Sequence, residues 1–167
     1  MIEMLQAELS DAQKLLEVQK ESFAVYAKRY GDFDSNPYYM DLHRMEFNIK
    51  YRFGQYYKLL DKEKKEIIGG LFCFELEEKE TMKIAQFYFL EPYQHLGYGS
   101  DVLKKLFALH PQVKKWYVDT IMQEEYNVEF YQHLGFEIID EEEEHEGLTF
   151  VTFLKKIKSV SYTHLRA

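Results

Sequence analysis

The sequence predicts a mixed α/β fold, with about seven strands in one sheet and about four helices on its faces. Apolar residues recur at helical spacing in four segments, and they alternate or run continuously in seven short ones. Charged turns, or turns with Gly or Pro, separate these segments. The 167 residues, 46% of them hydrophobic, suffice for one domain with its own core, so no disulfide or metal is needed for folding.

The first part of the chain is predicted to contain a strand, two helices and three more strands. The first strand covers residues 1–9, and a helix then starts at Ser10, with Gln13 as its partner in a capping box. Pro37 lies in the first turn of the second helix. Charged turns separate the three strands, which cover residues 56–60, 67–76 and 82–90.

The second part is predicted to contain a helix, a strand, a helix and two final strands. The third helix has an apolar face around Leu103, and Pro111 ends it. A strand follows at residues 115–121. The fourth helix, residues 124–134, is followed by Gly135 at the position where helices commonly turn left-handed.

The C-terminal part contains an acidic run and an unpatterned end. The last strands are predicted at residues 136–139 and 148–154, and the acidic run 140–146 is predicted to be a solvated turn between them. A metal site there is the alternative, but adjacent carboxylates of one turn do not converge on an ion without further ligands from elsewhere in the fold. Residues 159–167 resemble translated read-through of sequencing adapter, so we expect a non-native or disordered tail after a domain of residues 1–158.

Composition and charge exclude several classes of protein. The net charge of −8 argues against a nucleic-acid partner and mildly favours a cationic one, such as an amine. The apolar stretch 67–74 is far shorter than the roughly 20 residues of a membrane span, and the N-terminus carries acid where a signal peptide would carry base. The one cysteine, Cys73, forms no internal disulfide or multi-cysteine metal site. We therefore expect a cytoplasmic protein without a membrane partner.

The segment between the fourth strand and the third helix carries the main chemical signal. Two glycines spaced by one residue let the backbone turn tightly, and the first N–H groups of the helix point outward at its positive end. That arrangement suits a phosphate or diphosphate. A dinucleotide fingerprint would need Gly where Val102 stands, a P-loop would need Lys after Gly99, and a plain turn is the remaining alternative. The segment consists of Gln94, His95, Leu96, Gly97, Tyr98, Gly99 and Ser100.

Two motifs in register resemble one family. Gln94, Gly97 and Gly99 match the Arg/Gln-x-x-Gly-x-Gly/Ala signature of the GNAT-type N-acetyltransferase superfamily. Farther along, residues 127–136 are similar to its second signature, which joins an Asn, a Tyr and a Gly-Phe pair. The order of elements is also similar, from Met1 to about residue 158. The resemblance implies a single GNAT-like domain with a mostly antiparallel sheet that splays between its fourth and fifth strands.

The resemblance implies acetyl-CoA as the acyl donor and a primary amine, of a small molecule or peptide, as the acceptor. Main-chain N–H groups of residues 94–100 would hold the diphosphate. Main-chain groups of Phe89 and Leu90 would pair with the pantetheine arm, which Asn127 would also hydrogen-bond, and a strand N–H near Leu90 would stabilise the oxyanion. Tyr131 would sit near the thioester sulfur, and because a phenol with a pKa of about 10 is protonated at neutral pH, it could give its proton, or a hydrogen bond, to the leaving thiolate, whose thiol has a pKa of about 8.5. A core aromatic is the alternative role for Tyr131.

The general base is left open. Many members of the family carry a Glu where this chain has Gln86, which cannot accept a proton. Ordered water, Glu75, Glu91 or no protein base at all remain as alternatives. Cys73 as a covalent nucleophile is disfavoured, because it lies in an apolar strand without a nearby His. No metal site is expected, because the six histidines show no metal spacing.

The acceptor site is predicted between the first two helices. Acidic and aromatic side chains gather there and suit a cationic amine, although a plain surface loop is an equal alternative. A non-catalytic acyl-CoA-binding or interaction module and an unrelated α/β binding domain are the competing functions. An exposed strand edge, frequent in dimers of this superfamily, leaves a homodimer open. The acceptor residues are Tyr30, Asp32, Asp34, Tyr38 and Tyr39.

Overall fold

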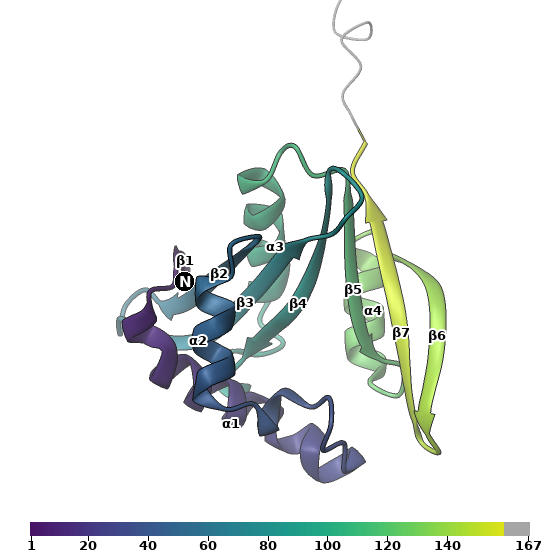
Figure 1. The fold of residues 1–167 in the computed structure, drawn as a ribbon, viewed down its shortest axis with the longest axis horizontal. Helices are drawn as coiled ribbons and strands as arrows, with labels where there is room; N and C mark the ends of the chain where they lie inside the picture. The colour runs from purple at the N-terminus through teal and green to yellow at the C-terminus, as the bar shows by residue number, and fades with distance from the viewer. Residues whose placement is uncertain (159–167) are drawn as a thin grey trace, which may run out of the picture. The chain divides into compact units, whose positions relative to one another are not determined.

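The computed structural model describes residues 1–158, and these contain the seven strands and four α-helices that the sequence predicts (Figure 1). The strands are β1 (Ile2–Gln6), β2 (Gly54–Asp61), β3 (Glu66–Glu75), β4 (Thr81–Phe89), β5 (Lys115–Ile121), β6 (Glu137–His145) and β7 (Leu148–Lys156). The helices are α1 (Ala12–Tyr30), α2 (Leu42–Lys50), α3 (Tyr98–Leu109) and α4 (Glu125–His133). The sheet order is β1-β2-β3-β4-β5-β7-β6, mostly antiparallel, with β5 parallel to β4. The mixed α/β fold class is confirmed.

The described residues form two compact units, one of residues 1–75 and 84–106, the other of residues 76–83 and 107–158. The domain prediction for residues 1–158 and the splay between the fourth and fifth strands stay predictions. The predicted tail, residues 159–167, lies outside the described residues. None of the helices in residues 1–158 is both long enough and apolar enough to cross a membrane.

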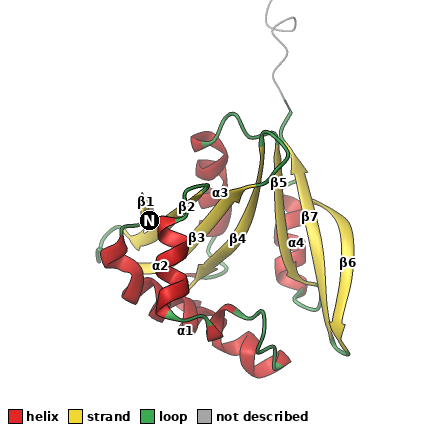
Figure 2. Ribbon diagram, viewed as in Figure 1, coloured by secondary structure: helices red, strands yellow, loops and turns green. Residues whose placement is uncertain are grey.

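In the first unit, α1 and α2 cover one face of the strands (Figure 2). Leu15 and Val18 are three residues apart on α1, so they face the same side, and both are buried. They join Met45 of α2 and Phe72 of β3 in one core cluster. The apolar stripe that predicted the first helix therefore builds this core.

The first helix starts later than predicted. A single 3-10 turn, Leu9–Asp11, precedes α1, and the Glu8 N–H donates to Asp11 Oδ2 at 2.8 Å. The predicted capping box of Ser10 and Gln13 is therefore wrong. Glu8 and Asp11 form the box instead, and Lys58 of β2 also holds the Asp11 carboxylate, at 3.0 Å.

The second helix also starts later. Pro37 lies in a separate 3-10 turn, Pro37–Tyr39, rather than in the first turn of α2. Asp41 caps α2 instead, since its Oδ1 accepts from the Arg44 N–H at 2.8 Å. This capping bond serves one of the unpaired N–H groups of the first turn, which a proline cannot do.

In the second unit, β5, β7 and β6 form an antiparallel ladder. Trp116, Val151 and Phe153 are fully buried in its core. The helix α4 ends at His133 with Leu134 as its cap, and Gly135 follows, as predicted, with a φ of +90° in the left-handed region. The Lys155 ammonium donates to the Leu134 carbonyl at 2.6 Å and so caps the helix end.

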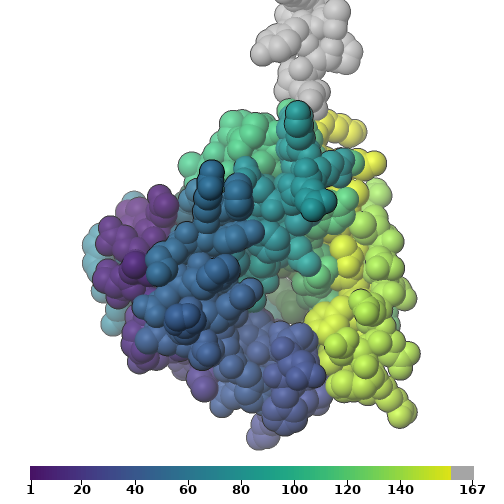
Figure 3. All heavy atoms as spheres, in the orientation of Figure 1, coloured from purple at the N-terminus to yellow at the C-terminus, as the bar shows by residue number. Residues whose placement is uncertain are grey.

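The acidic run 140–146 is mostly strand, so its prediction as a turn is wrong. β6 covers residues 137–145 and pairs with β7, for example Glu141 with Val151. All of its side chains are exposed, as the yellow-green margin of Figure 3 illustrates. The sequence lacks the usual alternation because neither face of this edge strand packs on a core, and its charges oppose edge-to-edge pairing.

Candidate functional site

The loop between β4 and α3 contains the backbone geometry that the glycine motif predicted. After β4 the chain makes a 3-10 turn, Glu91–Tyr93. His95 and Gly97 then adopt φ values of +60° and +85°. The latter lies in the left-handed region that favours glycine. No heavy atom lies within 4 Å of the position that a Cβ would take at Gly97, and residues 95–97 are exposed.

The loop leads directly into the N-terminus of α3. This helix begins at Tyr98, and its bonding starts with the Asp101 N–H, which donates to the Gly97 carbonyl at 3.4 Å. The N–H groups of Tyr98, Gly99 and Ser100 come before that bond, so the helix supplies no acceptor for them. Helical dipoles add positive potential at this end, which favours an anion.

Two side-chain hydrogen bonds hold the loop. Gln94 Nε2 donates to the Phe89 carbonyl at 2.8 Å, which ties the loop to the end of β4. The Tyr93 hydroxyl donates to Asp61 Oδ2 at 2.6 Å, which ties the 3-10 turn to the last residue of β2. This bond lowers the pKa of Asp61 and raises the pKa of Tyr93 to about 12. The geometry of the loop is therefore built before any ligand binds.

The main-chain groups of Phe89 and Leu90, at the end of β4, point in different directions. The Leu90 N–H donates to the Ile68 carbonyl of β3 at 2.9 Å, and the Leu90 carbonyl accepts from the Tyr93 N–H at 2.9 Å. Both main-chain groups of Leu90 are thus used within the fold. Main-chain groups alternate in direction along an antiparallel strand, so the Phe89 N–H points away from β3.

Asn127 and Tyr131 lie on α4, in the second unit. They are four residues apart, hence on one face of the helix. Asn127 is half-buried, whereas Tyr131 is 7% exposed. The Tyr131 ring packs against Phe136 and Phe153, with centroid distances of 5.4 and 5.5 Å. The ring is therefore held in place, as both predicted roles of Tyr131 require.

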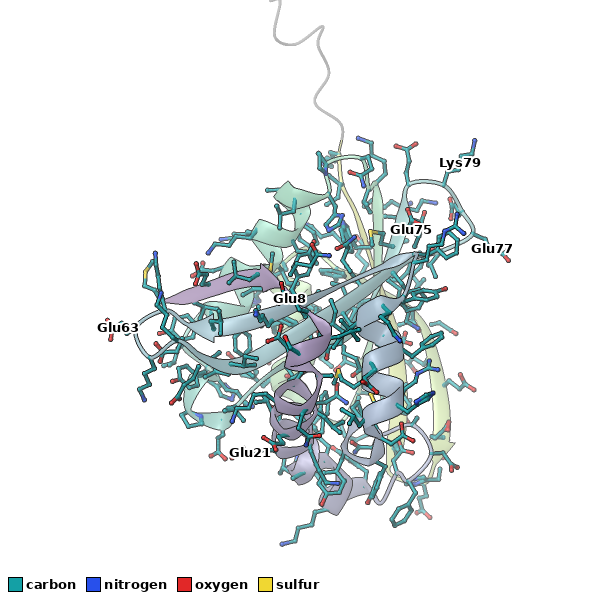
Figure 4. All side chains as sticks on the ribbon, turned by 60° about the vertical axis from the view of Figure 1, so that its left-hand side comes forward. Glu8, Glu21, Glu63, Glu75, Glu77 and Lys79 are labelled. Atoms are coloured by element: carbon teal, nitrogen blue, oxygen red, sulfur yellow. The ribbon has the colours of Figure 1, made fainter. Side chains whose placement is uncertain are left out.

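The structure brings the loop residues 94–100 together with Phe89 and Leu90 in the first unit. Among the candidate bases, Glu75 lies at the C-terminal end of β3, far from this loop. Figure 4 shows it on the opposite side from Glu63, which lies in the turn between β2 and β3. Antiparallel pairing of Ile68 with Leu90 leaves Glu75 about seven residues, or roughly 20 Å, from the loop. Glu91 is exposed and starts the 3-10 turn.

The predicted acceptor segment is ordered by its own side chains. Asp32 is 9% exposed, and its carboxylate accepts from the main-chain N–H and the hydroxyl of Ser35. The Lys20 ammonium lies 4.8 Å from the centroid of the Tyr38 ring, whose partner Tyr39 is exposed. Asp32 thus closes a turn, whereas Asp34 and Tyr39 are exposed and Tyr30 and Tyr38 are half-buried.

Sequence reasoning missed the partners that lie far away along the chain. Tyr93 and Asp61 are 32 residues apart, as are Tyr56 and Tyr88, whose hydroxyls are 2.6 Å apart. No local motif signals either pair, because each joins segments that only the tertiary fold brings together. Within residues 1–158, no group of three His, Cys, Asp or Glu side chains is arranged to hold a metal ion.

We expect Cys73 to be unreactive in the native protein. Its side chain is fully buried, and burial raises the pKa of its thiol to about 12, so the reactive thiolate is scarce below that pH. Labelling with a disulfide reagent at pH 8 should proceed in denaturant and stay below about a tenth of that extent without it. Cys73→Ala should retain full activity. Rapid native labelling, or an inactive Cys73→Ala variant that still folds, would restore the covalent mechanism.

Comparisons place this fold among known proteins. Residues 13–136 match the model of the acetyltransferase (GNAT) family. An acetyltransferase from Thermus thermophilus has a TM-score of 0.74 and 17% identity, over 94% of this chain and 97% of that one. The ribosomal-protein-alanine N-acetyltransferase from Escherichia coli has a TM-score of 0.78 and 11% identity, over 96% and 97%.

A third similar structure contains a ligand. The PaiA N-acetyltransferase from Thermoplasma acidophilum, in complex with coenzyme A, has a TM-score of 0.72 and 17% identity, over 94% of this chain and 99% of that one. No curated protein sequence matches the chain. At such identities the structural similarity shows the fold, whereas the family match rests on the sequence itself.

Proposed function

The chain belongs to the acetyltransferase (GNAT) family, and from this premise we propose that it transfers an acetyl group from acetyl-CoA to a primary amine of a small molecule or peptide. The observation that carries the proposal is the loop of residues 94–100. Its left-handed Gly97 and exposed backbone lead into the positive end of α3, which suits a diphosphate. The coenzyme A complex of the Thermoplasma relative supports the same donor.

The donor is proposed to contact two groups of residues. His95, Leu96 and the residues that follow contribute main-chain N–H groups to the diphosphate, while Gln94 braces the loop through Phe89. Pairing with the pantetheine arm is proposed for the Phe89 carbonyl, which keeps a second lone pair beside its bond from Gln94, because the Leu90 N–H points toward β3. Asn127 contributes a side-chain hydrogen bond to the same arm.

The reaction is proposed to be direct acyl transfer. The neutral amine attacks the thioester carbonyl, a C–N bond forms, and the C–S bond breaks. The Phe89 N–H, which points away from β3, is the candidate donor to the oxyanion. Tyr131 gives a proton to the departing thiolate and regains one from solvent, which also takes the proton lost from the amine, because Gln86 cannot accept it.

The acceptor is proposed to bind against residues 30–44, at the aromatic side chains that remain accessible there. The exposed Tyr39 ring can face a cation, whereas the Lys20 ammonium already lies over the Tyr38 ring. The Escherichia coli relative acts on an alanine of a ribosomal protein, which keeps a peptide amine among the candidates.

We further propose a cytoplasmic location, because the single cysteine is buried as a free thiol. A homodimer through β6 is disfavoured by the acidic side chains along that edge, whereas the β1 edge carries fewer charges. The net charge of −8 opposes binding to nucleic acid.

The test combines acetyl-CoA binding with thiol release. Calorimetry should detect acetyl-CoA binding, and a thiol reagent should detect coenzyme A release with at least one amine of a panel containing spermidine, butylamine and a short peptide. Gly97→Asp should weaken binding at least tenfold by placing a carboxylate beside the diphosphate. Gly97→Asn is the matched control, because Asn also tolerates a positive φ without adding charge.

Each outcome separates the candidate functions. Binding without thiol release for any amine supports the non-catalytic acyl-CoA-binding module, which the Gln86 substitution favours. The absence of binding at high micromolar acetyl-CoA contradicts both functions. Equal binding by the Gly97→Asp and Gly97→Asn variants contradicts the role of the loop.

A further inference from the structure

A chain of buried hydrogen bonds crosses the first unit from β4 to the turn before α2. The hydroxyls of Tyr88 and Tyr56 are 2.6 Å apart. The Tyr56 hydroxyl also donates to Gln19 Oε1 at 3.4 Å, and Gln19 Nε2 donates to the Pro37 carbonyl at 3.1 Å. Tyr88, Tyr56 and Gln19 are 4%, 2% and 0% exposed, so water does not compete with these bonds.

The protons of this chain run in one direction. A hydroxyl carries one hydrogen, so Tyr56, which donates to Gln19, must accept from Tyr88. Burial raises the pKa of both phenols, and both stay protonated at physiological pH. Hydrogen bonds aligned in this way polarise and strengthen one another.

Gly70 makes the contact between the two tyrosines geometrically feasible. β3 lies between β2 and β4 in the sheet, so the Tyr88 side chain must pass over β3 to reach Tyr56. A Cβ at Gly70 would lie 2.6 Å from Tyr88 Cζ and closer still to its hydroxyl, below any real Cβ contact. The ring therefore lies over the one β3 position in its path that has no side chain.

Gln19 holds both ends of the Pro37–Tyr39 turn. Besides the Pro37 carbonyl, its Nε2 donates to the sulfur of Met40 at 3.3 Å. The turn between these two points carries Tyr38 and Tyr39 of the acceptor segment. Because Tyr88 directly precedes Phe89, the chain connects the acceptor turn to the strand residue proposed to contact the acyl group.

We propose that Tyr88, Tyr56 and Gln19 are positioning residues that hold the acceptor turn in a fixed place relative to β4. The inference rests on the proposed function for the identity of the acceptor site, but the ordering of the turn does not depend on it. None of the three side chains touches the reacting atoms, and each acts through the turn.

The first measurement is hydrogen exchange of the unliganded protein, with Tyr88→Phe, Tyr56→Phe and Gln19→Met as variants. Exchange in the peptide of residues 36–41 should be about fivefold faster in Gln19→Met and about twofold faster in both Tyr variants, the scale of one lost hydrogen bond. The Gln19→Met, Tyr88→Phe double variant should match Gln19→Met alone, because both act through one chain. Tyr57→Phe, on the opposite face of β2, is the control and should leave this peptide unchanged.

The second measurement is kinetic. For the amine of the panel that reacts best, the KM of each variant should rise by about the same factor as its exchange rate in residues 36–41. The affinity of each variant for acetyl-CoA should stay within twofold of that of the unmodified protein. A merely structural role would lower the melting temperature but leave this KM unchanged.

Two results would overturn the inference. In one, Tyr88→Phe exchanges like Tyr57→Phe in residues 36–41. In the other, exchange accelerates but the KM of the amine does not move. A protein without acetyl-CoA binding instead refutes the proposed function, and the exchange data then still report whether the chain orders the turn.

Discussion

Tyr131→Phe is expected to lower kcat about 100-fold while leaving the affinity for acetyl-CoA unchanged. The substitution removes the proposed proton donor to the leaving thiolate and keeps the ring between Phe136 and Phe153. The packing contacts persist, so the melting temperature should change by only a few degrees. Steady-state rates with the best amine of the panel and calorimetry with acetyl-CoA provide the two measurements.

The pH dependence of this defect follows from the thiol. When the pH is below the thiol pKa of about 8.5, protonation stabilises the leaving sulfur. When the pH is above it, the free thiolate is already stable. The rate ratio of the unmodified protein to Tyr131→Phe should therefore fall as pH rises through about 8.5. Tyr126→Phe, an exposed tyrosine of the same helix, should keep the full rate. An unchanged kcat in Tyr131→Phe would leave Tyr131 as a core aromatic.

The sequence predicted those elements whose residues carry their own local signal. The strand at residues 115–121 coincides with β5, and Gly135 follows α4 with a positive φ, as its position predicted. Gly97 likewise adopts a left-handed backbone at the start of α3. In each case a periodic pattern or a glycine requirement acts within a few residues.

The parts that were missed depend on partners distant in sequence. β6 carries no apolar alternation, because its stability comes from its ladder with β7 and not from a core face. The engagement of the Leu90 N–H follows from the register of β4 against β3, which no local motif fixes. Asp11, which takes part in the capping box of the 3-10 turn before α1, is also held by Lys58 of β2, far away in the sequence.

Gly69→Ala is expected to destabilise the protein by about 3 kcal/mol, through an overpacked contact that cannot relax cheaply. A Cβ at Gly69 would lie closer to the Tyr88 main-chain carbonyl oxygen than any real Cβ atom comes to a neighbour. It would also lie 3.2 Å from the Phe89 side chain and 3.3 Å from the Leu59 side chain. The register of β2 and β3 shifts between Leu59 and Leu60, opposite Gly69. β3 must therefore move away from β4, whose end carries the candidate site.

The melting temperature should fall by about 10 °C for a chain of this size. Gly31→Ala is the control for backbone strain alone, because Gly31 has a φ of +61° but no atom within 4 Å of a Cβ; its cost should be about 1 kcal/mol. Gly70→Ala should also cost more than Gly31→Ala, since its Cβ would meet the buried Tyr88 ring and not open space. If Gly69→Ala melts no lower than Gly31→Ala, the two strands are not as closely apposed at this point as the structure has them, and the path of the Tyr88 ring over Gly70 loses its support as well.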